Sequence, residues 1–425
     1  MSAPREVLFT SDASGQLWNS CVWDFHTGTS LMQYRGGSSG SHSLCLLGDD
    51  YLVGGGGQKS LVNVWELQRK DQNQLKIILP GKVNCICASP DGNYCIFGIA
   101  EKIYIWQTCS GNLLKVISRH YLDVKCIKFT DDGSHFISGG EDNLVIVWCL
   151  ARTISSTDFP LSKPEPKYVW SGHSLPIRDV HVGAGGVRAR VISSSLDQTC
   201  KLWDMATGEL LCSFIFDTPI ISVSIDAAEM RIFAGSTNGN IFCVNLYGEP
   251  IRTERHIGNT AGEGINIFKG HSSQVNCLCV SMDGTVLASG SDDSTVKLWD
   301  IHSGQCIRTL DHKGAVTNAF ISLTPYNVLN PDSKPFLHVQ QFKRHLHTSC
   351  VEMRIRNNKR KIDDDNEKAL LELVHSKSSV PSENENDVNA VQEVVELKSK
   401  VSKLKSVNKE LYEYSVKQIV NKKKK

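Results

Sequence analysis

The sequence predicts an all-β fold, a β-propeller of seven blades, followed by a flexible linker and a C-terminal coiled-coil helix. The first observation behind this prediction is the segment 268–300, in which three short runs rich in β-branched residues are separated by turn formers such as Met282-Asp283-Gly284. The second is that this segment recurs upstream at a regular interval. A single unit of this kind cannot bury both of its faces, so the copies are expected to pack against one another.

The repeats are aligned on the last strand of each unit. The aligned positions are Trp23, Trp65, Trp106, Trp148, Trp203, Val244 and Trp299. Most of the steps between them fall in the period of about 40–45 residues that is typical of WD repeats, and the two longer steps equal one period plus an insertion. Seven units predict seven blades.

Three of the units carry a His, a Ser, an Asp and a Trp at matched spacing. In WD repeats these four side chains form one buried hydrogen-bonded chain, which leaves few polar groups unpaired. The three sets are His120, Ser138, Asp142 and Trp148; His173, Ser193, Asp197 and Trp203; and His271, Ser289, Asp293 and Trp299. The other four units are degenerate. We therefore expect all three histidines to be structural.

The first unit lacks one of the four strands that a blade needs. Strands are expected over 6–10, 19–24 and 30–35, and the run 315–323 follows the last unit. We expect 315–323 to pair beside 6–10, so that the two ends of the propeller domain, 1–323, close the ring and remove the free sheet edges. The alternative is an open, six-bladed arrangement with a frayed first repeat.

Composition excludes several classes of protein. The net charge is only +1, so no overall field favours nucleic acid or membrane. The sequence contains no apolar run of about 18 residues and no signal peptide, which predicts a soluble protein without a membrane partner. The 15 cysteines are scattered through the expected strands, a pattern that fits a reducing compartment better than a disulfide framework.

No motif for catalysis, cofactor binding or metal binding stands out. Gly54–Gly57 is followed by no phosphate-binding motif, so a strand turn is the expected role. The pairs Cys85/Cys87 and Cys277/Cys279 lie in expected inner strands without a matching second pair, which favours buried thiols over a metal site. We expect no catalytic residue, no cofactor and no metal, and hence no enzyme.

Two insertions occur where the repeat period is exceeded, at 151–167 and 247–265. Both are polar and contain Pro or Gly, so both are expected to be surface loops between the third and outer strands of the fourth and sixth blades. Such loops serve as binding elements or as filler, and the residues do not decide between the two.

After residue 323 the composition changes. The segment 324–389 reads as a flexible linker with a basic cluster, which together with Lys422–Lys425 in the basic tail 421–425 favours nuclear import. The segment 390–420 fits a heptad repeat, and the residues that would face a second helix are Val394, Leu397, Val401, Leu404, Asn408 and Leu411. β-Branched residues at a, Leu at d and one Asn at a favour a parallel homodimer. The alternative is a helix that packs on the propeller or in the groove of a partner.

Several segments resemble the WD repeat-containing protein 18 family. They are Trp65-Glu-Leu-Gln-Arg-Lys-Asp71-Gln72, Arg119-His-Tyr-Leu-Asp-Val124 with Ser134-His-Phe-Ile-Ser-Gly-Gly140, Ser194-Ser-Leu-Asp-Gln-Thr199, Lys313-Gly-Ala-Val-Thr-Asn318, and the tail helix around Asn408 and Lys409-Glu-Leu411. The resemblance covers 1–323 and 390–420. It implies a non-enzymatic scaffold in a nuclear and nucleolar complex that acts in pre-rRNA processing and large-ribosomal-subunit assembly.

The same resemblance implies partners and location. The partners would be a proline-, glutamate- and leucine-rich helical scaffold protein, testis-expressed protein 10, a SUMO protease and an AAA remodelling ATPase. The location would be the nucleolus and nucleoplasm, with some protein in the cytoplasm, and direct RNA contact stays open. Alternatives are an adaptor in DNA-damage checkpoint or chromatin and transcription complexes, or a substrate receptor of a cullin-type ubiquitin ligase. The last is disfavoured because the WDxR pattern is absent: His26, Ala206 and His302 occupy the Arg position.

Overall fold

A computed structural model describes residues 6–15, 18–56, 60–68, 74–155, 164–247, 253–258, 264–329, 335–344 and 346. The chain divides into two compact units, 1–349 and 350–425. All described residues belong to the first unit. The coiled-coil helix expected at 390–420 and the basic tail lie outside the described residues.

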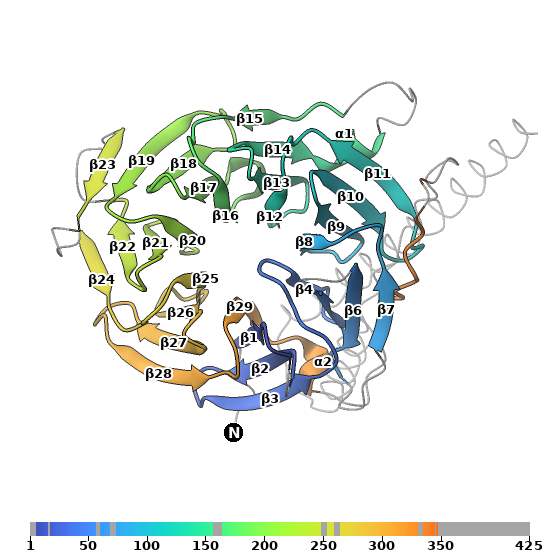
Figure 1. The fold of residues 1–425 in the computed structure, drawn as a ribbon, viewed down its shortest axis with the longest axis horizontal. Coiled ribbons are helices and arrows are strands. Elements are labelled where there is room, and N and C mark those ends of the chain that lie inside the picture. The colour runs from blue at the N-terminus through green and yellow to red at the C-terminus, as the bar shows by residue number, and fades with distance from the viewer. Residues whose placement is uncertain are drawn as a thin grey trace, which may run out of the picture. The chain divides into compact units, whose positions relative to one another are not determined.

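The first unit is a seven-bladed β-propeller, as predicted (Figure 1). The blades follow, with their strands in order from the channel to the rim. Blade 1 contains β29 (Val316–Leu323), β1 (Glu6–Asp12), β2 (Ser20–Asp24) and β3 (Thr29–Tyr34); blade 2 contains β4 (Leu44–Leu47), β5 (Tyr51–Gly55), β6 (Leu61–Glu66) and β7 (Gln74–Ile78). Blade 3 contains β8 (Val83–Ala88), β9 (Tyr94–Ile99), β10 (Lys102–Gln107) and β11 (Leu113–Ser118); blade 4 contains β12 (Val124–Phe129), β13 (His135–Gly140), β14 (Val145–Cys149) and β15 (Tyr168–Trp170).

The remaining blades follow in the same direction around the ring. Blade 5 contains β16 (Ile177–Val182), β17 (Arg190–Ser195), β18 (Thr199–Asp204), β19 (Leu210–Phe216) and β23 (Glu254–Ile257), and a short 3₁₀ turn, Gly186–Arg188, precedes β17. Blade 6 contains β20 (Ile220–Ile225), β21 (Arg231–Ser236), β22 (Ile241–Asn245) and β24 (Ile265–Phe268); blade 7 contains β25 (Val275–Val280), β26 (Val286–Ser291), β27 (Thr295–Asp300) and β28 (Cys306–Asp311).

The core lies between neighbouring blades. Each blade is a sheet that is covered on both faces, so its middle strands are buried along most of their length rather than on alternate residues. In β14, for example, every residue from Val145 to Trp148 is fully buried. The first two strands of a blade join through tight turns in which Gly92, Gly133 and Gly284 have φ values of 70°, 68° and 68°, a conformation that costs glycine little.

The two ends of the propeller meet in blade 1. β29 pairs antiparallel with β1, with Glu6 opposite Leu323 and Phe9 opposite Phe320, so the strand expected at 315–323 lies beside the one expected at 6–10. The rings of Phe9 and Phe320 stack at 5.1 Å. This pairing closes the ring and leaves no open edge at the junction, as a propeller requires.

The two insertions are more ordered than simple surface loops, so this expectation needs correction. The first begins with a short helix, α1 (Leu150–Ser155). The second contributes β23, which pairs in parallel with β19, the outer strand of the preceding blade (Figure 1). The edge of β19 offers unpaired backbone groups, and β23 satisfies them.

The expected linker, 324–389, also begins later than predicted. Residues 326–329 form α2 (Tyr326–Leu329), and residues 335–344 pack on blades 2 and 3. Leu337 and Phe342 bury their side chains there, and Val339 between them is partly buried against the same cluster. Apart from residue 346, the rest of the expected linker lies outside the described residues. In the part of the chain that is described, no helix is both long and apolar enough to span a membrane.

Candidate functional site: the hydrogen-bonded sets and the loops that they hold

The set in blade 7 forms one continuous chain of hydrogen bonds. The Trp299 indole N–H donates to Ser289 Oγ at 2.8 Å, the Ser289 hydroxyl lies 2.8 Å from His271 Nε2, and His271 Nδ1 lies 2.8 Å from Asp293 Oδ2. Each group donates once to the next, which assigns the imidazole proton to Nδ1. Burial lowers the pKa of His271, in keeping with a neutral ring.

Blades 4 and 5 repeat this arrangement. The indole-to-Ser distances are 3.0 Å in both, and the Ser-to-His distances are 2.8 Å in both. His120 and His173 each place Nδ1 3.0 Å from the carboxylate of Asp142 or Asp197. The structure thus brings together all twelve residues that the sequence placed in these sets.

The three carboxylates are held in their charged form. Burial opposes ionisation of Asp142, but the hydrogen bond from His120 and the N–H groups of Tyr121 and Leu144 outweigh it and lower the pKa. The pKa of Asp197 and that of Asp293 are lowered in the same way, against burial, by hydrogen bonds from the set histidine and from a neighbouring Thr. Each carboxylate therefore acts as a fixed acceptor at the end of its chain.

The sets fasten loops at one end of the propeller. His120 lies in the loop that enters blade 4 and Asp142 in the turn between β13 and β14, so their hydrogen bond ties the loop to the turn. The N–H of Tyr121 donates to the same Asp142 at 3.0 Å, and Asn143 Nδ2 donates to the carbonyl of Ser174 in the corresponding loop of blade 5. The loops are therefore held both within and between blades.

These fastened loops expose large apolar side chains. Tyr121 is 78% exposed, Leu122 is 53% exposed and Leu175 in the neighbouring loop is 47% exposed. Single exposed apolar side chains are common on protein surfaces, but several of them on neighbouring loops of fixed conformation are typical of protein-binding surfaces. We call Tyr121, Leu122 and Leu175 the apolar rim patch.

Blade 1 contains a partial set that sequence reasoning missed. The Trp23 indole N–H donates to Thr10 Oγ1 at 2.8 Å, and His312 lies near Trp23 in the loop that enters the blade. Thr10 stands where other blades have Ser, and His312 comes from the far end of the domain. The segment Asp311-His312-Lys313-Gly314 before β29 carries the signal for this set, but it lies about 300 residues along the chain from Thr10.

In blades 2 and 3 the indole N–H donates to a backbone carbonyl rather than to a serine hydroxyl. Trp65 donates to the carbonyl of Arg35 at 2.9 Å, and Trp106 donates to the carbonyl of Lys343 at 2.9 Å. From the strand register, Gly54 and Phe97 occupy the position of the set serine, so neither blade has a hydroxyl acceptor. Backbone carbonyls replace it. In blade 6, Val244 occupies the indole position and is fully buried.

The cysteine pairs are packed as thiols. Cys85 and Cys277 are buried, and burial raises the pKa of Cys85, Cys87, Cys277 and Cys279. Such thiols are poor nucleophiles and poor metal ligands. Within the described ranges, no group of three or more His, Cys, Asp or Glu side chains is arranged to hold a metal ion.

Comparison with known proteins agrees with this repeat architecture. The family profile described as WD domain, G-beta repeat matches residues 111–149, 164–204 and 262–300, the stretches that hold the three complete sets. The chain is 45% identical to WD repeat-containing protein 18 of Danio rerio over 98% of both chains. It is 49% identical to WD repeat-containing protein 18 of Homo sapiens over 81% of this chain and 79% of the relative. It is also 29% identical to Pre-rRNA-processing protein pro-1 of Caenorhabditis briggsae over 83% of this chain and 67% of that protein.

Proposed function

Because the chain belongs to the WD repeat-containing protein 18 family, we propose that it is a non-enzymatic scaffold that acts in pre-rRNA processing and large-ribosomal-subunit assembly in the nucleus and nucleolus. The observation that carries the proposal is the similarity over most of the chain to a relative named for pre-rRNA processing. A rigid ring with fastened loops fits the role of a scaffold, since loops held on a stable framework present a surface at little entropic cost.

The partners that we propose are those implied by the family resemblance: the proline-, glutamate- and leucine-rich helical scaffold protein, testis-expressed protein 10, the SUMO protease and the AAA remodelling ATPase. The apolar rim patch is the surface that we assign to one of these contacts. Exposed aromatic and aliphatic side chains next to polar loops are the usual anchors of protein interfaces. The heptad segment would then pair two copies and double the sites available to a repeated partner.

The experiment that tests the proposal is purification of the tagged full chain from nuclear extract at moderate salt, followed by identification of the bound proteins. We expect the helical scaffold partners, the ATPase and large-subunit precursors. Recovery of a cullin and its adaptor in their place would overturn the proposal and favour a ubiquitin-ligase receptor.

A second measurement assigns the surface. The double variant Tyr121→Ser/Leu122→Ser is expected to lose at least one partner, because the anchors of the interface are removed. In cells depleted of the wild-type protein, this variant is expected to leave large-subunit pre-rRNA precursors unprocessed. Ile307→Ser is the matched control, since Ile307 is 54% exposed on the outer strand of blade 7. Equal binding and processing by both variants would exclude the apolar rim patch.

A further inference from the structure

The chain does not leave the propeller where its last strand ends. After β29 and α2, the described residues 335–344 and 346 lie across blades 2 and 3, and we call them the strap. Two strap side chains are buried, Leu337 at 5% and Phe342 at 7% exposure. The residues beside them are exposed: His338, Gln340, Gln341, Lys343 and Arg344. The strap therefore binds mainly through two apolar anchors five residues apart, with Val339 partly buried between them.

Leu337 is the first anchor. Its backbone N–H donates to Asp50 Oδ2 at 2.6 Å, in the turn between β4 and β5. Its side chain lies over Gly48 and Gly92, in the first turns of blades 2 and 3. A Cβ atom on either glycine would come within 2.6 Å or 2.9 Å of Leu337 Cδ1, so the absence of side chains there makes room for the leucine.

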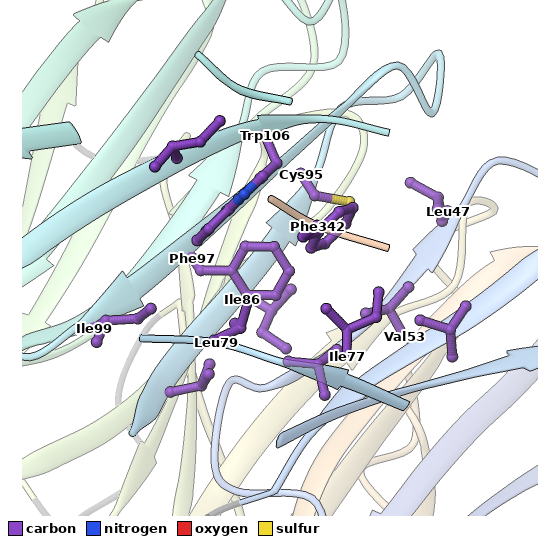
Figure 2. Close-up of a cluster of buried hydrophobic side chains, with 14 of the residues drawn as sticks. Leu47, Val53, Ile77, Leu79, Ile86, Cys95, Phe97, Ile99, Trp106 and Phe342 are labelled. Atoms are coloured by element: carbon purple, nitrogen blue, oxygen red, sulfur yellow. The ribbon is translucent and has the colours of Figure 1, made fainter. Parts of the chain in front are cut away.

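Phe342 is the second anchor. Its ring stacks on that of Trp106 at 5.5 Å and meets that of Phe97 edge-on at 5.7 Å. Figure 2 shows Phe342 beside these two residues, within the apolar cluster between blades 2 and 3 that includes Ile77 and Leu47. Stacked and edge-on aromatic contacts add to the free energy gained from burial.

Backbone hydrogen bonds extend the contact to the rim. The N–H of Lys343 donates to the carbonyl of Gly111 at 2.7 Å, and the N–H of Gln340 faces the carbonyl of Thr108 at 3.4 Å. Leu346 then forms a parallel bridge with Leu113 on the outer strand β11. Gly111 and Leu113, which contact the strap backbone, lie at the outer edge of blade 3, where a strand added to the sheet would also bind.

Blade 3 has a specific need for this segment. In a complete blade the indole N–H donates to a serine of the neighbouring strand, but Phe97 occupies that position here. The Trp106 N–H is buried and takes its acceptor from the strap, the carbonyl of Lys343. Without the strap, a buried donor would lose its partner and an aromatic surface would be open to water.

We propose that the groove between blades 2 and 3 is a peptide-binding site for an extended segment with Leu and Phe anchors five residues apart, and that its occupant is the strap of the same chain. The strap then carries the chain as far as the rim of blade 3, where Leu346 bridges to Leu113. This role does not depend on the function in pre-rRNA processing.

Hydrogen exchange on the full chain tests the proposal. Phe342→Ala is expected to make the amides of Leu337, Gln340 and Lys343 exchange about 100-fold faster, and to speed exchange in β10 and β11, because the larger anchor is lost. Gln340→Ala is the matched control, since it removes an exposed side chain and keeps the backbone contact. Unchanged exchange in the strap and blade 3 of the Phe342→Ala variant would overturn the proposal.

Trp106→Phe provides a variant that keeps an aromatic ring beside Phe342. It removes the indole N–H together with part of the ring system, and we expect strap amides to exchange at least roughly 5-fold faster, the effect of losing one hydrogen bond. No acceleration would show that the Lys343 carbonyl does not hold the strap, which contradicts the proposal.

A synthetic peptide of residues 335–346 tests whether the groove is a peptide site. Added to the full-length Phe342→Ala variant, it is expected to restore slow exchange in β11, whereas the same peptide with Phe342→Ser is not. Failure of the first peptide would refute a peptide-binding groove. Exchange in the wild-type strap is expected to be independent of protein concentration; faster exchange on dilution would mean that a second copy supplies the strap, and would overturn occupancy by the same chain.

Discussion

His312 lies against Trp18, with ring centroids 4.8 Å apart and planes at 72°. Trp18 comes from the turn that follows β1, and His312 comes from the loop before β29, so the two ends of the propeller interlock through side chains as well as through strand pairing. Neither ring nitrogen of His312 has a hydrogen-bond partner among the residues described, and burial lowers its pKa to about 4. The ring is therefore neutral near pH 7.

The neutral His312 predicts acid sensitivity at this junction. An unfolded histidine binds a proton near pH 6.5, whereas folded His312 binds one only near pH 4. The unfolded state therefore becomes increasingly favoured as the pH falls through this window. We expect the free energy of unfolding to fall less from pH 7 to pH 4.5 in His312→Phe than in the wild type. The difference reaches on the order of 3 kcal/mol once His312 is fully protonated. Urea unfolding at both pH values measures this.

A residual slope is expected in the variant. His181 is also buried, which lowers its pKa to about 3, so it acts in the same direction over an overlapping range. Identical pH dependence in the wild type and His312→Phe would contradict the assignment of the acid sensitivity to this junction.

The complete sets predict a non-additive effect of mutation. Ser193→Ala leaves the Trp203 N–H without an acceptor and His173 Nε2 without a donor, and both groups are buried, so we expect a loss of about 2–3 kcal/mol in the free energy of unfolding. Trp203→Phe removes the stranded donor, and the double variant should therefore cost less than the sum of the single ones. Denaturant unfolding of the three variants gives the coupling, with Ser41→Ala at an exposed site as the control.

Close packing between Gly98 and Cys85 predicts that a substitution of Cys85 relieves the destabilising effect of a substitution of Gly98. A Cβ atom at Gly98 would collide with Cys85 Sγ, while its next contacts, with Val124, would be 3.3 Å and 3.4 Å. We expect Gly98→Ala to destabilise the fold by about 1–3 kcal/mol. In a Cys85→Ala background the same change is expected to cost less than half as much, because the sulfur is gone. An equal cost in both backgrounds, measured by thermal unfolding, would show that the strain arises elsewhere.

The heptad segment predicts a dimer, and the structure decides how to test it. Light scattering is expected to give twice the chain mass for the full protein and the monomer mass for residues 1–349. A chain that ends at Leu323 is unsuitable, because it lacks the strap that covers Trp106. Leu397→Ser with Leu404→Ser keeps the full length and is expected to be monomeric; monomeric mass for the unmodified chain would refute dimerisation.

The sequence by itself was enough to predict the number of blades, the twelve residues of the complete sets and the pairing of the two ends. The first two features are local: a strand shows in the alternation or branching of a few residues, and each complete set lies within one repeat, at a spacing imposed by the length of its strands and turns. The pairing of the two ends followed instead from counting strands, because the first unit lacks one strand and 315–323 is left over after the last unit. The family resemblance rested on such local segments as well.

Only the tertiary structure decided the other features that join distant parts of the chain. His312 packs beside Trp23 and its partner Thr10, Trp106 takes its acceptor from Lys343, and β23 leaves its own blade to pair with β19. A backbone carbonyl accepts a hydrogen bond whatever its side chain, and a few apolar residues in a short segment do not specify the groove that receives them. Such contacts depend on where the closed ring places each surface, which the local pattern of residues does not encode.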